Sequence, residues 1–86
     1  MTKSVFSPAY KSLLETLVAI RKERGVSQAE LARRLDRTQQ FVSNYEVGIR
    51  RLDVVEFYEV MTALEVDAVG AFGRVVARFG AGLATS

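Results

Sequence analysis

The sequence predicts an all-α domain of five helices, formed by a single folded unit. Apolar residues recur at spacings of three and four along the chain, and no stretch shows the alternation typical of strands. Residues that favour helix N-termini precede the apolar stretches, and glycines follow several of them. A chain of 86 residues has the length of one domain. We therefore expect one domain over residues 1–79, followed by a flexible tail over residues 80–86.

The first two helices have clear start and stop signals. Ser7 caps a helix that opens with Pro8, where a missing N–H group costs nothing, and Gly25 ends this helix. Ser27 and Glu30 have the spacing of a capping box at the start of the second helix. The side chains expected to face the core from these two helices are Tyr10, Leu13, Leu14, Leu17, Val18, Leu31, Ala32 and Leu35.

The remaining helices also begin at capping residues. Thr38, Asp53 and Asp67 cap helices expected over residues 39–46, 54–64 and 68–79, respectively. Glu56, three places after Asp53, completes the acceptor pattern at the start of the fourth helix. The expected inward residues of the third and fourth helices are Val42, Tyr45, Phe57, Val60, Met61 and Leu64.

The composition argues against several classes of protein. The chain has no cysteine and no histidine, which removes disulfides, thiolate zinc sites, cysteine nucleophiles and the commonest general base. We therefore expect a protein that is not an enzyme and that needs no metal or other cofactor. No apolar run has the length of a signal peptide core or a membrane span, so we expect a soluble cytoplasmic protein without a membrane partner.

Charge is distributed unevenly along the chain. Residues 21–51 carry eight basic and four acidic side chains, whereas residues 52–67 carry five acidic side chains and no basic one. Such a division favours one positive face that binds nucleic acid. The alternative is an ordinary solvated helix surface.

The centre of the chain has the pattern of a helix-turn-helix. Two helices of about eight residues are separated only by Asp36 and Arg37, and the small side chain of Ala32 permits close approach. The exposed residues at the start of the second of these helices are amides, Gln39 and Gln40, with Asn44 one turn later. An amide both donates and accepts, so it can pair with the N6 and N7 atoms of adenine in the major groove.

Residues 27–48 resemble the helix-turn-helix core of the Cro/C1-type (XRE) family, and are especially similar to the lambdoid phage repressors, whose recognition helix also opens Thr-Gln-Gln. The similarity extends over residues 10–67, with residues 63–67 resembling the closing segment of the family. The resemblance implies a five-helix, lambda-repressor-like DNA-binding domain.

The resemblance also implies roles for individual residues. Gln39, Gln40 and Asn44 would read bases, and the residues that would contact phosphates are Gln28, Arg37, Thr38, Ser43, Arg50 and Arg51. The alternative for Arg50 and Arg51 is a solvated pair in a loop.

Three residues depart from the family pattern. Asp36 stands at the usual turn glycine, and aspartate tolerates the left-handed conformation better than most residues. Arg37 replaces an apolar residue, and either points its head at a phosphate or loosens the turn. Phe41 replaces a small polar residue, and either contacts a thymine methyl group or packs against the second helix.

Arg21 and Glu46 are expected to form a structural ion pair. Arg21 continues the apolar stripe of the first helix, and Glu46 lies on the inward side of the third helix. Two charges at a buried rim are costly unless they meet, and the family has an Arg–Glu pair at these offsets.

The fifth helix has two possible roles. Its apolar side chains, Phe72, Val75, Val76 and Phe79, either complete the core of the monomer or form a dimer interface. Gly70 and Gly73 would let a neighbouring backbone approach closely. Because one small domain reads few base pairs, we expect a homodimer on an inverted repeat.

These patterns predict a sequence-specific, double-stranded DNA-binding regulator of transcription, a repressor that acts on the bacterial nucleoid as a homodimer. The alternative is an antitoxin-like subunit whose main role is to bind another protein, whose identity the sequence does not give.

Overall fold

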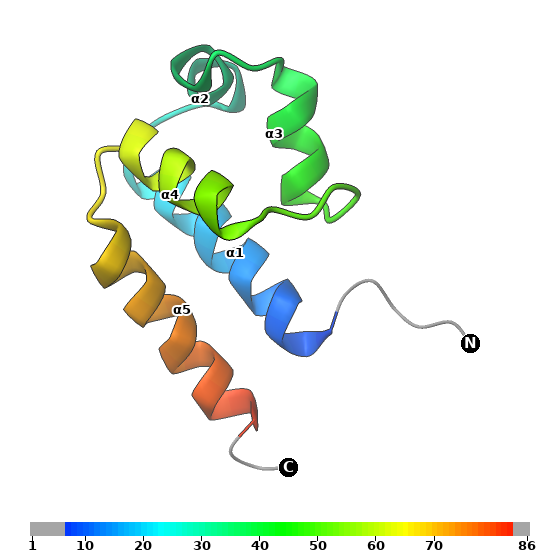
Figure 1. Cartoon of the computed structure of the whole chain (residues 1–86), viewed down its shortest axis with the longest axis vertical. Helices are drawn as coiled ribbons and strands as arrows, with labels where there is room; N and C mark the ends of the chain where they lie inside the picture. Colours follow the sequence, from blue (N-terminus) through cyan, green and yellow to red (C-terminus); the bar gives the residue numbers. More distant parts are fainter. Residues whose placement is uncertain (1–6, 84–86) are drawn as a thin grey trace.

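Five helices account for most of the chain. The computed structural model describes residues 7–83, with side chains described through residue 79. The helices are α1 (Pro8–Glu23), α2 (Gln28–Leu35), α3 (Gln39–Glu46), α4 (Val54–Ala63) and α5 (Ala68–Leu83) (Figure 1). Residues 7–83 contain no strand, which confirms the all-α class. The parts of the expected domain and tail at residues 1–6 and 84–86 lie outside the described residues.

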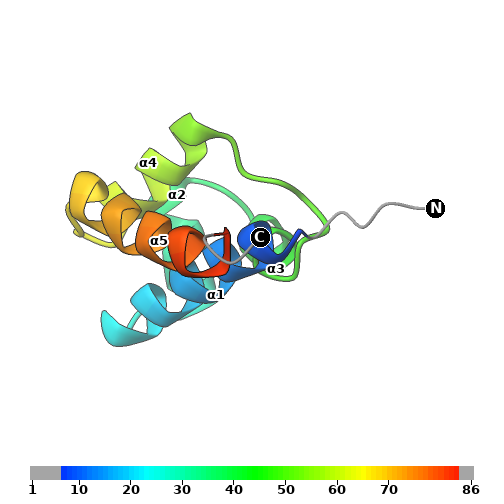
Figure 2. The same ribbon diagram turned by 90° about the horizontal axis from the view of Figure 1, so that it is seen from below.

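The longest helices form one side of the molecule. α1 and α5 run side by side in opposite directions, and α2 and α3 lie together beyond one end of α5 (Figures 1 and 2). α4 contacts both α2 and α5, and so links the two halves of the domain. This arrangement leaves one side of α3 free of other helices (Figure 1).

The core lies between the five helices, with α1 in contact with α3 and α5, and α4 in contact with α2 and α5. Each helix contributes at least one side chain with almost no exposed surface, because its apolar residues recur on one face. The most deeply buried of these are Leu17, Leu31, Val42, Tyr45, Met61 and Val75.

All five predicted caps are present, but the capping box predicted for α2 is incomplete. Ser7, Thr38 and Asp53 accept hydrogen bonds from the backbone three residues later, and Asp67 does the same for Gly70 at 2.8 Å. Ser27 also accepts from the Glu30 backbone at 3.0 Å, but the expected return bond of the capping box is absent from α2.

The Glu30 carboxylate instead binds two arginines of its own helix. Its oxygens accept from Arg33 at 2.9 and 2.6 Å and from Arg34 at 2.9 Å. Hydrogen bonds from two charged guanidinium groups are stronger than one from a single backbone N–H group, which explains why the capping box of α2 is incomplete.

The fifth helix is longer than the sequence predicts. It continues from the expected end at residue 79 to Leu83, so residues 80–83 are helical rather than part of a tail. Contact with α1 supports this end of α5, since Arg78 donates to Thr16 and Glu15 at 3.0 Å each. Tertiary contacts of this kind override the low helix propensity of glycine.

The apolar residues of α5 divide between the two predicted roles. Val75 is fully buried within the monomer, so the expectation that it lies at a dimer interface is wrong. Phe79 is half-buried, whereas Phe72 and Val76 are 46% and 43% exposed. Because residues 75 and 76 point in different directions from the helix axis, the helix fills the core and also presents an apolar outer face.

Two further observations hold for the part of the chain that the structure describes. None of its helices combines the length and the apolar character needed to cross a membrane. It also contains no group of three or more acidic side chains placed to hold a metal ion.

Candidate nucleic-acid interface

The turn between α2 and α3 is closed by backbone hydrogen bonds. The N–H groups of Asp36 and Arg37 donate to Arg33 and Ala32 at 3.1 and 2.9 Å. This geometry places Asp36 at φ 58° and ψ 43°, in the left-handed region where the family usually has glycine. Aspartate tolerates this conformation, so the turn survives the substitution, as the sequence predicts.

One side of α3 faces away from the core. It carries Gln39 and Gln40, which are exposed, with Ser43 and Asn44 half-buried beside them. Val42 and Tyr45 on the other side are fully buried. The helix therefore presents a row of amide and hydroxyl groups on a rigid support, as the sequence predicts for a recognition helix.

The amide side chains on this face contact one another. Gln40 donates through Nε2 to Asn44 Oδ1 at 2.9 Å, one helical turn away. Gln39 donates to Gln28 Oε1 of α2 at the long distance of 3.5 Å. These contacts orient the amides, and they leave the Oε1 atoms of Gln39 and Gln40 and one N–H group of each amide without a hydrogen bond to the described side chains.

A buried ion pair fixes the recognition helix from behind. Arg21 of α1 donates to Glu46 of α3 through Nε at 2.7 Å and through Nη2 at 3.2 Å, with side-chain exposures of 9% and 5%. Arg21 Nη1 also donates to the carbonyl of Val26 at 2.8 Å. Gln28 donates to Glu46 Oε1 at 2.7 Å, so the ion pair connects directly to the interface.

Phe41 packs inside the domain. It is 9% exposed, and its ring meets that of Tyr45 edge-on with centroids 5.7 Å apart. Of the two roles predicted for Phe41, internal packing fits this geometry. The exposed part of the ring is too small for contact with a thymine methyl group.

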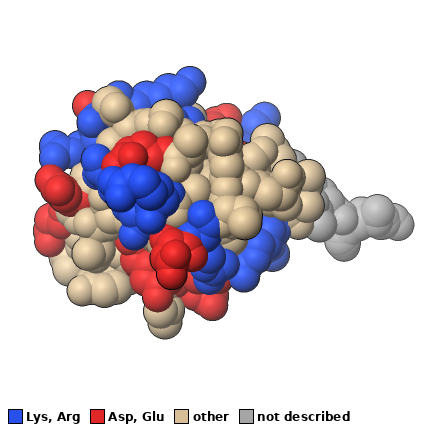
Figure 3. Space-filling model, turned by 90° about the horizontal axis from the view of Figure 1, so that it is seen from above, with Lys and Arg blue, Asp and Glu red and all other residues tan. Residues whose placement is uncertain are grey.

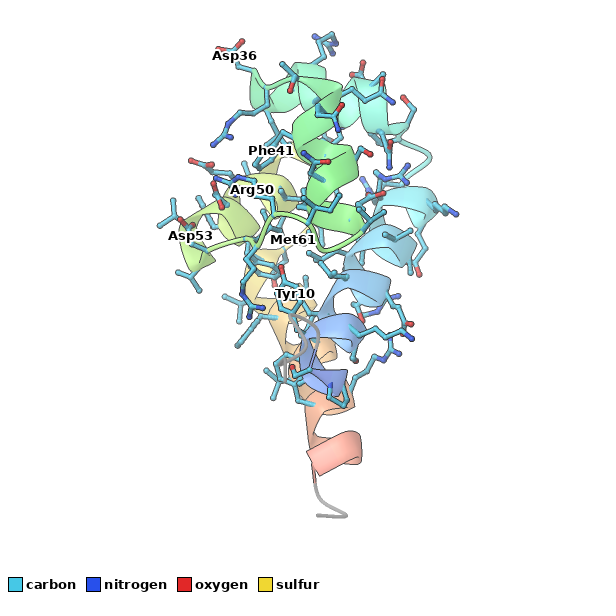
Figure 4. All side chains as sticks on the ribbon, turned by 90° about the vertical axis from the view of Figure 1, so that its right-hand side faces the viewer. Tyr10, Asp36, Phe41, Arg50, Asp53 and Met61 are labelled. Atoms are coloured by element: carbon cyan, nitrogen blue, oxygen red, sulfur yellow. The ribbon has the colours of Figure 1, made fainter. Side chains whose placement is uncertain are left out.

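Two arginines that flank α3 converge on the same ring. The guanidinium carbon of Arg37, before α3, lies 4.2 Å from the Phe41 ring centroid, and that of Arg50, after α3, lies 5.0 Å from it. Figure 4 shows Arg50 between Phe41 and Asp53. Neither arginine extends into solvent as an isolated cation.

Glu56 of α4 is the acid that both arginines meet. It accepts from Arg50 at 2.9 and 2.8 Å and lies 3.5 Å from Arg37 Nη2. The Arg50 hydrogen bonds lower the pKa of Glu56 to about 2, with a further contribution from the backbone N–H of Asp53. Sequence reasoning identified Glu56 only as a helix-capping residue, since nothing local predicts its contact with Arg37.

The chain matches the family model described as helix-turn-helix (HTH_3) over residues 17–69. It also resembles the solved structure of an XRE-family like protein from Pseudomonas syringae pv. tomato str. DC3000, with 38% sequence identity and a TM-score of 0.77. That match covers 81% of this chain and 85% of the other. The chain belongs to the XRE family of helix-turn-helix proteins.

Further neighbours of this XRE-family chain are restriction-modification controller proteins. The wild-type controller protein C.Esp1396I matches with a TM-score of 0.78 and 24% identity, over 86% of this chain and 95% of that one. A tyrosine-to-phenylalanine mutant of the same controller matches with a TM-score of 0.76 and 26% identity, over 85% and 92%. No curated protein sequence matches the chain. The family supports a DNA-binding regulator of transcription.

The charge pattern of this XRE-family domain differs from the expected single positive face. At the end formed by α2 and α3, basic and acidic side chains lie next to one another (Figure 3). Glu56, which belongs to the acidic segment of the sequence, forms ion pairs with Arg37 and Arg50. Glu30 pairs with Arg33 and Arg34 of its own helix. Folding therefore mixes charges that the sequence keeps apart.

Other loop residues around the interface have defined contacts. The guanidinium of Arg51 lies 4.0 Å from the ring centroid of Tyr10, and the Tyr10 hydroxyl accepts from the backbone of Leu52 at 3.2 Å. Val47, which sequence reasoning did not single out, is 57% exposed one turn after Ser43. Its helical spacing from Gln40 and Ser43 is the signal that could have identified it.

Proposed function

We propose that this chain is a sequence-specific repressor of transcription, without enzymatic activity, that binds double-stranded DNA as a homodimer on an inverted repeat. The observation that carries the proposal is the row of outward-facing amides on α3, held in place by the buried contact between Arg21 and Glu46. A merely solvated helix needs neither the amides nor the rigid support.

The amides are suited to reading bases in the major groove. Gln39 and Gln40 lie at the start of α3, where the recognition helix of a helix-turn-helix meets base edges. Each retains an acceptor oxygen and one N–H group after its internal contact, which is the pair that adenine requires. Asn44 would extend the reading by one turn.

The polar groups around α3 would contact the phosphates on either side. These groups are Gln28, Arg37, Thr38, Ser43, Arg50 and Arg51. Such contacts position the domain without reading sequence. They also make binding salt-dependent, with a slope of about 0.9 in log K per phosphate neutralised.

The outer face of α5 would form the two-fold interface. Val69, Phe72 and Val76 are 81%, 46% and 43% exposed at helical spacing, and a Cβ atom added at Gly73 between them would meet nothing within 4 Å. A glycine in mid-helix lowers stability by about 0.5–1 kcal/mol, and no neighbour in the monomer requires it. The close approach of a second copy would explain both the apolar face and the glycine.

Selection of sites from random DNA tests base reading. The wild-type protein is expected to enrich an inverted repeat with half-sites about 10 base pairs apart. Gln39→Ala or Gln40→Ala should cost about 1–3 kcal/mol on that site and relax the preference at one or two positions per half-site. Identical preferred sites for wild type and both variants would refute the assignment.

Sedimentation equilibrium tests the dimer. Val76→Glu should weaken self-association and remove cooperative binding to the two half-sites. Val55→Glu is the matched control, because Val55 is 60% exposed and lies on the opposite side of α4 from Phe57, whose ring contacts that of Phe72. Equal association of both variants and wild type would exclude this interface. Truncation before α5 would be a poor test, since it also removes Val75 from the core.

A further inference from the structure

We propose that Glu56 is a positioning residue for DNA binding, which acts by holding the guanidinium groups of Arg37 and Arg50 beside the recognition helix. This inference rests on the proposed function. None of the residues expected to touch DNA lies on α4. The proposal therefore gives α4 an indirect role, in which it positions the arginines that contact phosphates.

Glu56 is itself held in place. It is 8% exposed, it lies at the third position of α4, and its Oε1 atom accepts from the backbone N–H of Asp53 at 3.0 Å. The Asp53 side chain accepts in turn from the Glu56 backbone at 2.7 Å. The capping box therefore holds the carboxylate by contacts that do not involve either arginine.

The contacts of Arg50 leave one edge of its guanidinium free. Its Nη1 atom donates to Glu56 Oε1 and to the carbonyl of Arg51, each at 2.9 Å, and its Nη2 atom donates to Glu56 Oε2 at 2.8 Å. The Nε–H group and the second N–H group of Nη2 have no partner within residues 7–83. These two groups are parallel and form the fork that binds a phosphate bidentately.

Arg37 completes the arrangement from the other end of α3. Its guanidinium carbon lies 4.2 Å from the Phe41 ring centroid, and its Nη2 atom lies 3.5 Å from Glu56 Oε2. Two guanidinium groups that contact the same ring and the same carboxylate would repel each other if that carboxylate were absent. The attraction of each arginine to the Glu56 carboxylate offsets that repulsion, and both guanidinium groups also contact the face of the Phe41 ring.

The energetic benefit is preorganisation. An arginine in solvent loses side-chain entropy when it binds a phosphate, whereas Arg50 has already been ordered by folding. The negative charge of Glu56 also weakens the electrostatic attraction between the domain and any DNA. The carboxylate should therefore strengthen binding to the specific site and weaken non-specific binding.

A double-mutant cycle on DNA binding tests the proposal. The probes are the duplex that the wild type selects from random DNA and a scrambled duplex of the same length. Glu56→Gln keeps the size of the side chain but replaces an acceptor oxygen with a donor facing Arg50. It should bind the selected duplex about tenfold more weakly, an effect of the size expected for one charge-assisted hydrogen-bonded contact. In the Arg50→Ala background the same substitution should weaken binding by only about twofold, because the longer contact with Arg37 is then the only one left to lose.

Glu65→Gln is the matched control, since it removes the same charge from an exposed position after α4. It should bind both duplexes at least as tightly as the wild type, because a negative charge is lost. Arg50→Lys provides a second test that does not disturb the cap. It keeps the charge and the salt dependence but lacks the fork, so it should also bind about tenfold more weakly.

The proposal is wrong if Glu56→Gln binds the selected duplex as tightly as Glu65→Gln, or if its loss is the same with and without Arg50. It is also wrong if Arg50→Lys binds like the wild type. A wild-type protein that selects no sequence at all would instead refute the proposed function. If the protein still selects a DNA sequence, and this selection depends on Gln39 but binding is unchanged in Glu56→Gln, only the positioning role of Glu56 would be refuted.

Discussion

Replacing Glu46 by alanine should destabilise the domain severely, because the substitution leaves a buried cation without its partner. Arg21 is 9% exposed in its side chain and would keep only the bond from Nη1 to the Val26 carbonyl. Breaking one side of a buried ion pair costs about 3–5 kcal/mol. At about 0.05–0.15 kcal/mol per residue, a domain of 86 residues has a total stability of about 4–13 kcal/mol. The substitution would thus remove a large part of it.

Thermal and urea unfolding, followed by circular dichroism, would measure this loss. For a domain of this size each kcal/mol shifts the Tm by about 4–8 °C, so Glu46→Ala should lower the Tm by at least about 12 °C. The urea midpoint should fall while the m-value stays the same, because the surface exposed on unfolding changes little. Glu23→Ala is the control, since Glu23 and Arg74 are 54% and 48% exposed, and an exposed pair contributes less than about 1 kcal/mol.

A double replacement separates the ion pair from simple loss of packing. Arg21→Met combined with Glu46→Met should recover much of the stability, because no charge is then left buried without a partner. A loss from Glu46→Ala that is no larger than that from Glu23→Ala would refute the reasoning. So would a double-mutant cycle in which the two substitutions add without coupling.

Three further substitutions test other contacts. Arg50 holds the pKa of Glu56 at about 2, below its ordinary value of 4.5, so this carboxylate stabilises the fold fully above pH 4.5 and progressively less as the pH falls towards 2. The assay is the urea midpoint measured as a function of pH. Between pH 4.5 and 2 the midpoint of Glu56→Gln should fall less than that of the wild type. If the two midpoints fell in parallel, the lowered pKa of Glu56 would be contradicted. The Tyr45 hydroxyl is buried without a hydrogen-bond partner among the described residues, and this burial raises its pKa. Tyr45→Phe should be neutral or stabilise by up to about 1 kcal/mol in urea unfolding, and a loss of more than about 1 kcal/mol would reveal a missed partner. Gly73→Ala should stabilise the monomer by about 0.5–1 kcal/mol but weaken self-association in sedimentation, and unchanged association would remove the argument for close helix approach.

The sequence predicts well those features that local physics determines. The left-handed turn at Asp36 and the start of α3 after Thr38 follow from residues within a few positions of each other. The exposed amides of α3 follow from helical periodicity alone. The Arg21–Glu46 contact was predictable too, because each charge falls on an otherwise apolar stripe.

Features that depend on the packing of distant segments were not predictable in this way. Glu56 has the sequence signature of a helix cap, and only the fold brings it to Arg37, which lies 19 positions earlier. The burial of Val75 depends on how α5 rotates against α1 and α4, which two adjacent valines in a sequence do not reveal. The extension of α5 to Leu83 likewise depends on the support of α1 rather than on propensity.

The support behind α3 has a consequence for the thermodynamics and kinetics of DNA association. A helix of eight residues is too short to persist alone in water, yet Val42 and Tyr45 are fully buried and Glu46 is tied to α1. DNA would therefore meet a helix that is already in its final shape. The heat-capacity change on association should match the surface buried between two rigid bodies, without the excess that accompanies folding on binding, and the approach to equilibrium should contain no slow folding step.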